Sequence, residues 1–319
     1  MRRVLIVLLT MLVLSGCDHS EPIEGPRKIG FASRLNRSII EGTEDLQQQE
    51  LRLYGAYTLD GGTARVFDAE RLYYDATLPG WDYDNTRYWI MNAAYRFCAV
   101  SPYSLPRISF DDESGVCTID DYIGYTGGHD ILYASAERDL KDNEDYSTVL
   151  LRFSHACAGV QFNLINASSQ VLKDVRNIRL VGLQNRGDFS FDAEGSAEWV
   201  LDDSTIGDSD YEQPFGGICT LPSGGLPVNL NVKYPLYNEQ VLLVLPQTVY
   251  KTATTLHLEY IKEGDAEYAI RNIELGWLGG TTPTEWKAGE KYEYNLTITD
   301  NTITAEVRVV DWIDHFVDL

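Results

Sequence analysis

Apolar and polar side chains alternate along much of the second half of the chain. The runs at 228–234, 256–260, 292–298 and 303–309 place an apolar residue at every second position. Strict alternation is typical of β-strands that bury one face of a sheet. Asp300 and Asn301 separate the last two runs, so the sequence predicts a hairpin between them.

The first half contains shorter and more closely spaced strand patterns, at 28–33, 51–59, 64–67, 72–74, 87–90 and 95–100. No segment sustains the period of an amphipathic helix over twelve residues, and only 44–51 and 169–175 offer a helical turn or two. Two sheets packed face to face bury alternating strands without helices. The sequence therefore predicts an all-β fold of β-sandwich domains.

A length of 319 residues suggests two domains, at roughly 150 residues per domain. Hydrophobic residues make up 44% of the chain, which is enough to build a core in each. The best boundary is the charged run 137–147, which contains no apolar partner for Leu140. We therefore expect an N-terminal domain at 28–146 and a C-terminal domain at 147–319.

The first 17 residues have the pattern of an export signal. Two arginines precede an apolar run at 4–13, which is about half the roughly 20 residues that a membrane-spanning helix needs. The sequence Leu-Ser-Gly-Cys at 14–17 resembles the lipobox of bacterial lipoproteins. We therefore expect a signal peptide at 1–16, lipidation of Cys17 and a tether at 17–27. The alternative is an unmodified Cys17 behind an ordinary signal peptide.

Acidic residues outnumber basic ones by 48 to 26, which gives a formal net charge of −22 at pH 7. Such a field repels nucleic acids, so nucleic-acid binding is not expected. The five histidines are too far apart for a local zinc motif, and no acidic cluster matches a calcium-binding loop. No cofactor is predicted, although a weak calcium site at 202–212 stays an alternative to a solvated loop.

The sequence contains no common nucleophile or phosphate-binding motif. His155 and Cys157 share one face of a predicted strand, but nothing identifies an oxyanion hole or a third group that orients the histidine. A core histidine bonded to the backbone is the favoured interpretation. We assign no catalytic residue, and an exported hydrolase with an unrecognised pair of carboxylates remains an alternative.

Four cysteines follow Cys17, at positions 98, 117, 157 and 219. An exported protein meets an oxidising compartment, where a bond between Cys98 and Cys117 would close a loop of about 20 residues. Cys98 and Cys157 also lie in apolar strand patterns, where a buried free thiol is at least as well supported. Both interpretations stay open, and a disulfide scaffold is not predicted.

Five aromatic residues cluster within fifteen positions, at Trp81, Tyr83, Tyr88, Trp89 and Tyr95. Aromatic rings fill cores and also stack on sugars. Core filling is the favoured interpretation, although Tyr88 and Trp89 are neighbours on a strand and therefore point to opposite faces. One exposed ring is expected from this pair, and a glycan-binding surface is the alternative.

Several short segments follow one another in a distinctive order. They are Lys28 to Phe31 with Arg34 and Arg37, Trp81 to Tyr83 with Tyr88 and Trp89, Tyr95 to Phe97 with Pro102, Phe153 to His155 with Ala158, Leu245 to Gln247, Trp286 to Tyr292 and Val309 to Trp312. Behind a lipobox, this order resembles the fimbrillin family of type V pilus subunit precursors across essentially the whole mature chain. The resemblance implies two transthyretin-like β-sandwich domains, no enzymatic activity and assembly by strand exchange. In that scheme an Arg-specific protease removes the first strand, and a strand from a neighbouring subunit fills the groove.

The first residues of the fold give this scheme a physical form. Ile29 and Phe31 share one strand face, and burying each side chain contributes about 1.5–3 kcal/mol. Removing the strand would open an apolar slot with unpaired backbone, which favours strand addition. Arg34 and Arg37 follow in a stretch with little apolar pattern, and we favour cleavage at Arg37. The alternative is an uncleaved lipoprotein with two surface arginines.

The last apolar residues are the candidate donor. Val307, Val309 and Trp312 would supply the strand to a neighbour, or they form the last strand of their own sandwich. Donation requires this segment to leave its own domain.

The sequence thus predicts a non-enzymatic lipoprotein, anchored in the outer membrane, exposed on the cell surface and incorporated into a fimbrium after processing. Its expected partners are other fimbrial subunits, in a homo- or heteropolymer, and a host or glycan ligand. The alternative is a monomeric glycan-binding lipoprotein of the outer membrane. The scheme requires Ile29 and Phe31 to be buried. It also requires that their strand is not fixed centrally between two neighbours of one sheet, so that the domain stays intact when the strand is removed.

Overall fold

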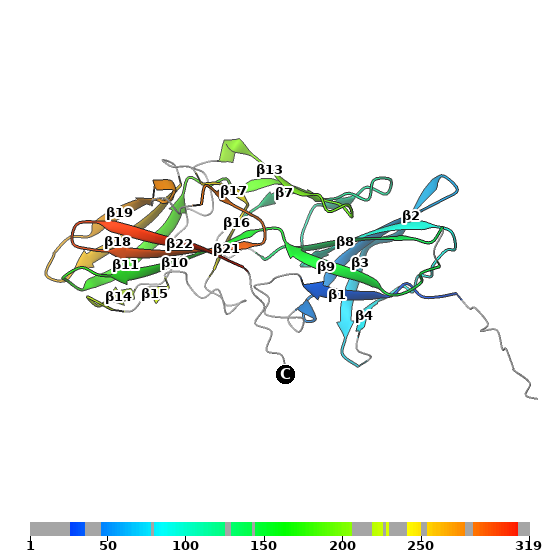
Figure 1. Cartoon of the computed structure of the whole chain (residues 1–319), viewed down its shortest axis with the longest axis horizontal. Helices are drawn as coiled ribbons and strands as arrows, with labels where there is room; N and C mark the ends of the chain where they lie inside the picture. The colour runs from blue at the N-terminus through cyan, green and yellow to red at the C-terminus, as the bar shows by residue number, and fades with distance from the viewer. Residues whose placement is uncertain are drawn as a thin grey trace, which may run out of the picture.

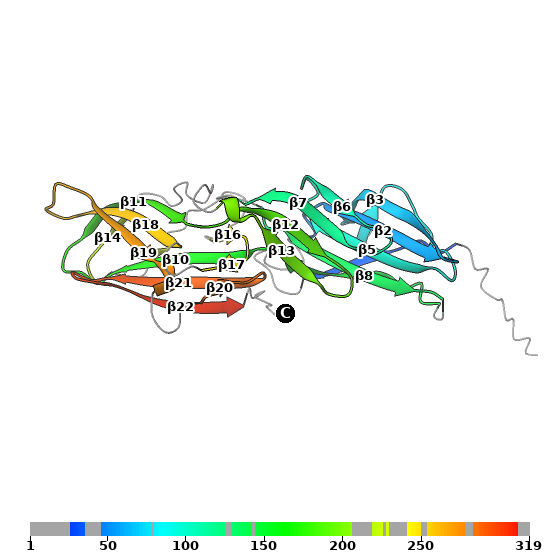
Figure 2. The same cartoon turned by 90° about the horizontal axis from the view of Figure 1, so that it is seen from above.

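The computed structural model describes residues 26–35, 46–77, 80–124, 129–141, 144–205, 219–225, 228–229, 241–249, 254–277 and 283–311. Its elements are β-strands and two short 3-10 helices, η1 (Asp203–Thr205) and η3 (Leu275–Trp277). The predicted all-β fold is confirmed. The sheets form two halves that lie end to end (Figures 1 and 2). Within the described ranges, no helix is long and apolar enough to cross a membrane.

The N-terminal half is built on a closed barrel of seven strands. In sheet order these are β1 (Phe31–Leu35), β4 (Gly80–Tyr83), β3 (Gly62–Asp75), β2 (Leu51–Leu59), β5 (Ala94–Ser101), β8 (Leu132–Asp139) and β9 (Val149–His155). The barrel core buries Leu53, Phe67 and Phe97. Asp60 and Gly61 connect β2 to β3 with positive φ angles at both positions, which is the backbone that a tight hairpin turn requires.

A second sheet covers the outer face of β2 and β5. It contains, in order, β13 (Ala197–Leu201), β12 (Arg186–Phe191), β7 (Cys117–Ile123) and β6 (Ile108–Phe110). Tyr54 and Cys98, on the outer face of the barrel, share one buried cluster with Ile119 and Phe189 of this sheet. β5 is therefore buried on both faces over most of its length, which explains its nearly continuous apolar run.

The C-terminal half is a sandwich of two larger sheets. One contains β15 (Val228–Asn229), β10 (Ala158–Asn166), β21 (Glu290–Ile298) and β22 (Ile303–Asp311), with β16 (Leu242–Val244) also paired to β10. The other contains β14 (Cys219–Leu221), β11 (Leu172–Val181), β18 (Thr255–Lys262) and β19 (Ala269–Glu274). Trp286, Tyr292 and Tyr294 lie in the core between them. A small pair, β17 (Gln247–Thr248) and β20 (Glu285–Trp286), completes the half.

The alternating runs of the second half form strands as predicted. The runs at 256–260, 292–298 and 303–309 lie in β18, β21 and β22. Asp300 and Asn301 form the turn of the last hairpin, where the Thr299 N–H donates to the Thr302 carbonyl oxygen at 2.8 Å. Of the run at 228–234, only the two residues of β15 lie within the described part of the chain.

Strand pairing crosses the expected domain boundary. β9 follows residue 146 but belongs to the barrel, and β12 pairs with β7 of the N-terminal half. Leu140 is only 1% exposed and joins the barrel core. The charged run around it therefore holds the end of β8 and the connection to β9 within one sheet. The division into 28–146 and 147–319 stays a prediction.

Three hydrogen bonds fix the connection between the halves, where β9 ends and β10 begins. The Ala156 N–H donates to the Ile131 carbonyl oxygen at 2.9 Å, and the Gly289 N–H donates to the Cys157 carbonyl oxygen at 2.9 Å. The Trp199 indole N–H donates to the Ala156 carbonyl oxygen at 2.6 Å. The junction is thus bonded to segments of both halves.

Gly55 on β2 makes room for the aromatic core of the barrel. A Cβ at this position would lie 2.8 Å from Cδ1 of Phe97 and 3.2 Å from Cδ2 of Phe67. Because these rings would have to shift, we expect Gly55→Ala to lower the free energy of unfolding by about 1–3 kcal/mol in urea titrations. Gly62→Ala is the control, since its nearest atom would be the Leu59 carbonyl oxygen at an ordinary 3.6 Å. Equal effects of the two substitutions would contradict this packing.

Candidate functional site

The first described segment of the chain is held by two neighbours in succession. Before β1, the Ile29 N–H donates to the Arg87 carbonyl oxygen at 2.9 Å and the Trp89 N–H donates to the Arg27 carbonyl oxygen at 3.0 Å. β1 then runs parallel to β9, with residue pairs from Phe31↔Val149 to Leu35↔Phe153. On its other side β1 meets β4 at the single pair Phe31↔Trp81.

Ile29 and Phe31 are buried as predicted, with 0% and 4% of their surface exposed. The Phe31 ring packs edge-to-face against three rings of the barrel core, with centroid distances of 5.6 Å to Phe67, 6.0 Å to Tyr83 and 5.4 Å to Phe97. Such pairs favour this geometry because the edge of one ring is positive and the face of the other negative. Phe31 therefore fills an aromatic slot that strands from across the barrel create.

Polar contacts line the same segment on its β4 side. The Tyr83 hydroxyl donates to the Ile29 carbonyl oxygen at 2.7 Å, and burial raises the pKa of Tyr83 to about 12. The Lys28 ammonium lies 2.5 Å from Asp82 and holds the pKa of that carboxyl below its ordinary value. Both members of the Lys28–Asp82 pair are well exposed, so this pair adds little stability. Apolar burial and backbone pairing are the main forces on the strand.

β1 lies between two neighbours, β4 and β9, in a closed barrel, contrary to the expectation that it is not held between two strands. Its contact with β4 is a single residue pair, and β4 keeps four pairs to β3 without it. On the other side, β9 pairs with β1 at five residues and with β8 at only two. Loss of β1 would therefore open the barrel between β4 and β9, remove none of the other strand pairs and leave the backbone of β9 largely unpaired. Unpaired buried backbone is unstable, so the slot favours a replacement strand.

One of the two candidate cleavage sites, Arg34, lies differently from its predicted position. β1 extends two residues beyond the expected end at Ser33, because the backbone pairing with β9 continues to Leu35. Arg34 therefore lies within the strand, opposite Arg152, and not beyond it. Arg37 and the lipidation candidate Cys17 lie outside the described residues.

The candidate donor residues lie in the other half of the molecule. β22 pairs with β21 along its whole length, from Glu290↔Asp311 to Ile298↔Ile303, as the last strand of its own sheet. Val307 packs partly buried against the C-terminal core, whereas Val309 is 55% exposed. Trp312 lies outside the described residues. The structure therefore places Val307 and Val309 in a different sheet from Ile29 and Phe31.

The aromatic cluster fills the barrel core. Trp81, Tyr83, Trp89 and Tyr95 are buried, and Tyr88 is the exposed ring at 49%. The Trp89 and Tyr95 rings meet edge-to-face at 4.8 Å. A sugar-stacking platform would need exposed ring faces, so the glycan-binding alternative keeps only Tyr88 of these five residues.

His155 is a core histidine, and a buried carboxylate is one of its partners. Its Nδ1 lies 2.8 Å from Oδ1 of Asp130, and the two side chains are 1% and 2% exposed. Burial and the charge of Asp130 raise the pKa of the Cys157 thiol, the opposite of the shift that activates a nucleophilic cysteine. Asp130 is the orienting group that the sequence did not reveal, because it lies 25 residues away in the chain. The side chains of Asp130, His155 and Cys157 lie buried near the junction of the halves, where they contribute to its packing.

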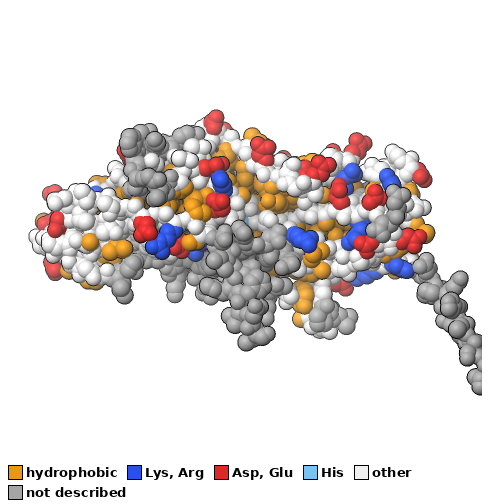
Figure 3. All heavy atoms as spheres, in the orientation of Figure 1, with side chains coloured by type: hydrophobic (Ala, Val, Ile, Leu, Met, Phe, Trp, Pro, Cys, Tyr) orange, Lys and Arg blue, Asp and Glu red, His pale blue; other side chains and the backbone are white. Residues whose placement is uncertain are grey.

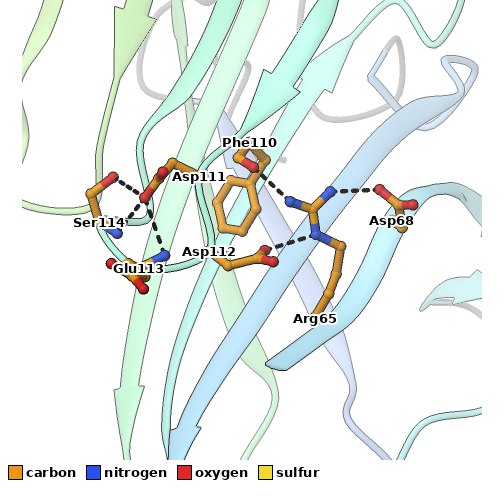
Figure 4. Close-up of polar contacts among 7 residues, drawn as sticks. All are labelled: Arg65, Asp68, Phe110, Asp111, Asp112, Glu113 and Ser114. Carbon is orange, nitrogen blue, oxygen red and sulfur yellow. Dashed lines mark hydrogen bonds and ion pairs between the residues drawn. The ribbon is translucent and has the colours of Figure 1, made fainter. Parts of the chain in front are cut away.

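The acidic cluster around Asp112 forms structural contacts (Figure 4). Arg65 on β3 donates to Oδ1 of Asp112 at 2.7 Å and to the Phe110 carbonyl oxygen at 2.6 Å. Asp111 accepts from the Ser114 N–H and hydroxyl, each at 2.7 Å, and these two bonds lower the pKa of its carboxyl. The cluster therefore fixes the β6–β7 turn to β3.

Asp and Glu side chains are scattered over the face that Figure 3 shows. Among the described residues, no group of three or more His, Cys, Asp or Glu side chains is placed to hold a metal ion. Most of the calcium-site candidate at 202–212 lies outside those residues.

A model of the fimbrillin-like family matches residues 47–312. The structure is similar to a crystallised fimbrial protein from Bacteroides vulgatus, with a TM-score of 0.60, 17% identity and coverage of 90% of this chain and 100% of that one. A proposed cell adhesion protein from Bacteroides uniformis gives a TM-score of 0.53 at 14% identity, over 92% and 100% of the two chains. At these identities the likeness shows the fold alone. No curated protein matches the chain in sequence.

Burial predicts unequal roles for the two predicted strand-exchange segments. We expect Phe31→Ala to lower the free energy of unfolding by about 3–5 kcal/mol, because it leaves a cavity among three rings. Val309→Ala should change it by less than about 0.5 kcal/mol, because that side chain is more than half exposed. Thermal or urea unfolding of the uncleaved chain measures both. Similar losses for the two variants would place the stabilising contacts elsewhere.

Proposed function

Because the chain belongs to the fimbrillin-like family, we propose that it is a structural subunit or adhesin of bacterial fimbriae, without enzymatic activity, at the cell surface. One observation carries this proposal: Ile29 and Phe31 are buried in a slot that β1 and the residues just before it fill. A fimbrial subunit needs a way to join its neighbours. A removable strand supplies it, since the emptied slot presents apolar surface and unpaired backbone to a strand from another subunit.

We propose cleavage at Arg37 as the trigger. Arg37 follows the last residue of β1, so a cut there releases the whole strand in one piece. Arg34 is a poorer site because its backbone is part of the ladder with β9, and a protease needs the chain in an extended, unpaired form.

We propose β22 as the donor strand. Val307 and Val309 stand two residues apart on one strand, the same spacing as Ile29 and Phe31, so their side chains can enter the same slot. Release of β22 requires the nine residue pairs with β21 to break. The pairs that form with β9 in the neighbouring subunit offset this cost, and Trp312 would extend the apolar face of the donor.

The first residues supply the attachment in this proposal. After removal of the signal peptide 1–16, lipidated Cys17 would anchor the precursor in the outer membrane, and 17–27 would act as a tether. Cleavage at Arg37 would then separate the fold from its anchor, so release and exposure of the slot occur in one step. The partners are other fimbrial subunits in a homo- or heteropolymer.

Limited proteolysis tests the trigger. Treatment of the purified chain with an Arg-specific protease should release the first strand and produce a ladder of oligomers that resists SDS. We expect Arg37→Ala to abolish the ladder and Arg34→Ala, the matched control, to leave it intact. A ladder that persists in the Arg37 variant, or cleavage at Arg37 that yields monomers only, would overturn the trigger.

Fractionation of cells tests the anchor. We expect Cys17→Ala to move the precursor from the envelope fraction to the soluble exported fraction, because no acyl chain can then be attached. Cys219→Ala is a control for the loss of a cysteine as such. Retention of the Cys17 variant in the envelope would contradict lipid anchoring at this residue.

A further inference from the structure

Two cysteines face each other across the sheets of the N-terminal half. Cys98 on β5 is the residue partner of Tyr54 on β2, and Cys117 on β7 is the partner of Phe110 on β6. The Tyr54 and Phe110 rings stack across the sheets, with centroids 6.0 Å apart and planes inclined by 22°. Tyr54 and Phe110 thus face each other across the two sheets. Their strand partners, Cys98 and Cys117, therefore also stand opposite each other.

The two thiols lie in the same buried cluster of the interior. Cys98 and Cys117 are both free, fully buried members of the cluster between the barrel and the covering sheet. Burial and a hydrogen bond with the Cys117 thiol raise the pKa of Cys98 well above its ordinary value. Cys157 belongs to the same cluster, but the charge that acts on its thiol is that of Asp130. The structure therefore distinguishes one facing pair from a third, separate thiol.

We propose that Cys98 and Cys117 form an intersheet disulfide when the chain folds in an oxidising compartment. The two thiols together lose two protons and two electrons, and a sulfur–sulfur bond forms between them. The oxidant is a disulfide-exchange reagent, whose own disulfide is reduced to two thiols. The bond would fasten the covering sheet, through β7, to the barrel strand β5.

The bond would form during folding and not afterwards. Exchange requires a thiolate that the oxidant can reach, and in the native state both thiols are fully buried. We expect β5 and β7 to meet in the partly folded chain before β12 and β13 complete the covering sheet and exclude water. After folding, the same burial protects the disulfide from reductants. The disulfide would close a loop of about 20 residues. We expect this to raise the melting temperature by about 5–10 °C relative to the reduced chain.

Refolding of the full chain tests the proposal without reference to its place in the cell or to fimbrial assembly. The denatured, reduced chain is refolded with oxidised glutathione or under reduction, unfolded again, alkylated and digested for mass spectrometry. We expect oxidative refolding to give a peptide that links Cys98 to Cys117 and lacks two hydrogens, with Cys157 alkylated. Oxidant added after reductive refolding should give far less of this product. Alkylation of both residues after oxidative refolding, or a link from either of them to Cys157, would overturn the proposal.

Four variants separate the effect of the bond from that of side-chain packing. Cys157→Ala should keep the linked peptide and the difference in melting temperature between oxidised and reduced material. Cys98→Ala and Cys117→Ala should each abolish that difference, and the double variant should change it no further, because the two residues act as one unit. A difference that persists in either single variant would show that oxidation stabilises the chain by another route.

Discussion

The parallel pairing of β1 with β9 closes the barrel on which the N-terminal half is built. Without it, β4 and β9 would face each other across an open gap, and most of the backbone of β9 would have no partner. Phe31 makes the pairing stable, because its ring fills the space among Phe67, Tyr83 and Phe97. β1 is also the first strand of the described chain, so a single cut after Leu35 would separate it from all the strands that follow. The strand that closes the barrel is therefore the one whose pairs could be lost without breaking any pair between the other barrel strands.

The covering sheet imposes a second constraint on the barrel. β2 and β5 must be apolar on both faces, since one face lines the barrel and the other packs under β7 and β12. The hairpin β12–β13 comes from beyond the junction of the halves. The N-terminal half therefore cannot complete its packing before a later part of the chain has arrived. Until then the space between β5 and β7, where Cys98 and Cys117 face each other, stays open to water.

Local pattern predicted the elements more completely than their partners. Alternation located β18, β21 and β22 because each strand buries one face, and it placed Ile29 and Phe31 on a buried face. It could not predict that β1 pairs in parallel with β9, since parallel partners are distant in sequence and carry no turn signal between them. For the same reason Arg34 was expected beyond the strand, and Asp130 was not recognised as the partner of His155. The charged run around Leu140 shows the same effect, because its one aliphatic residue is buried by strands that lie elsewhere in the chain.

The junction at Ala156 and Cys157 has a mechanical consequence. Its backbone is bonded to Ile131, Trp199 and Gly289, which belong to three different segments. A tensile load along the long axis would pass through this short connection, and the three hydrogen bonds would distribute it among those segments. These bonds would also oppose bending between the two halves.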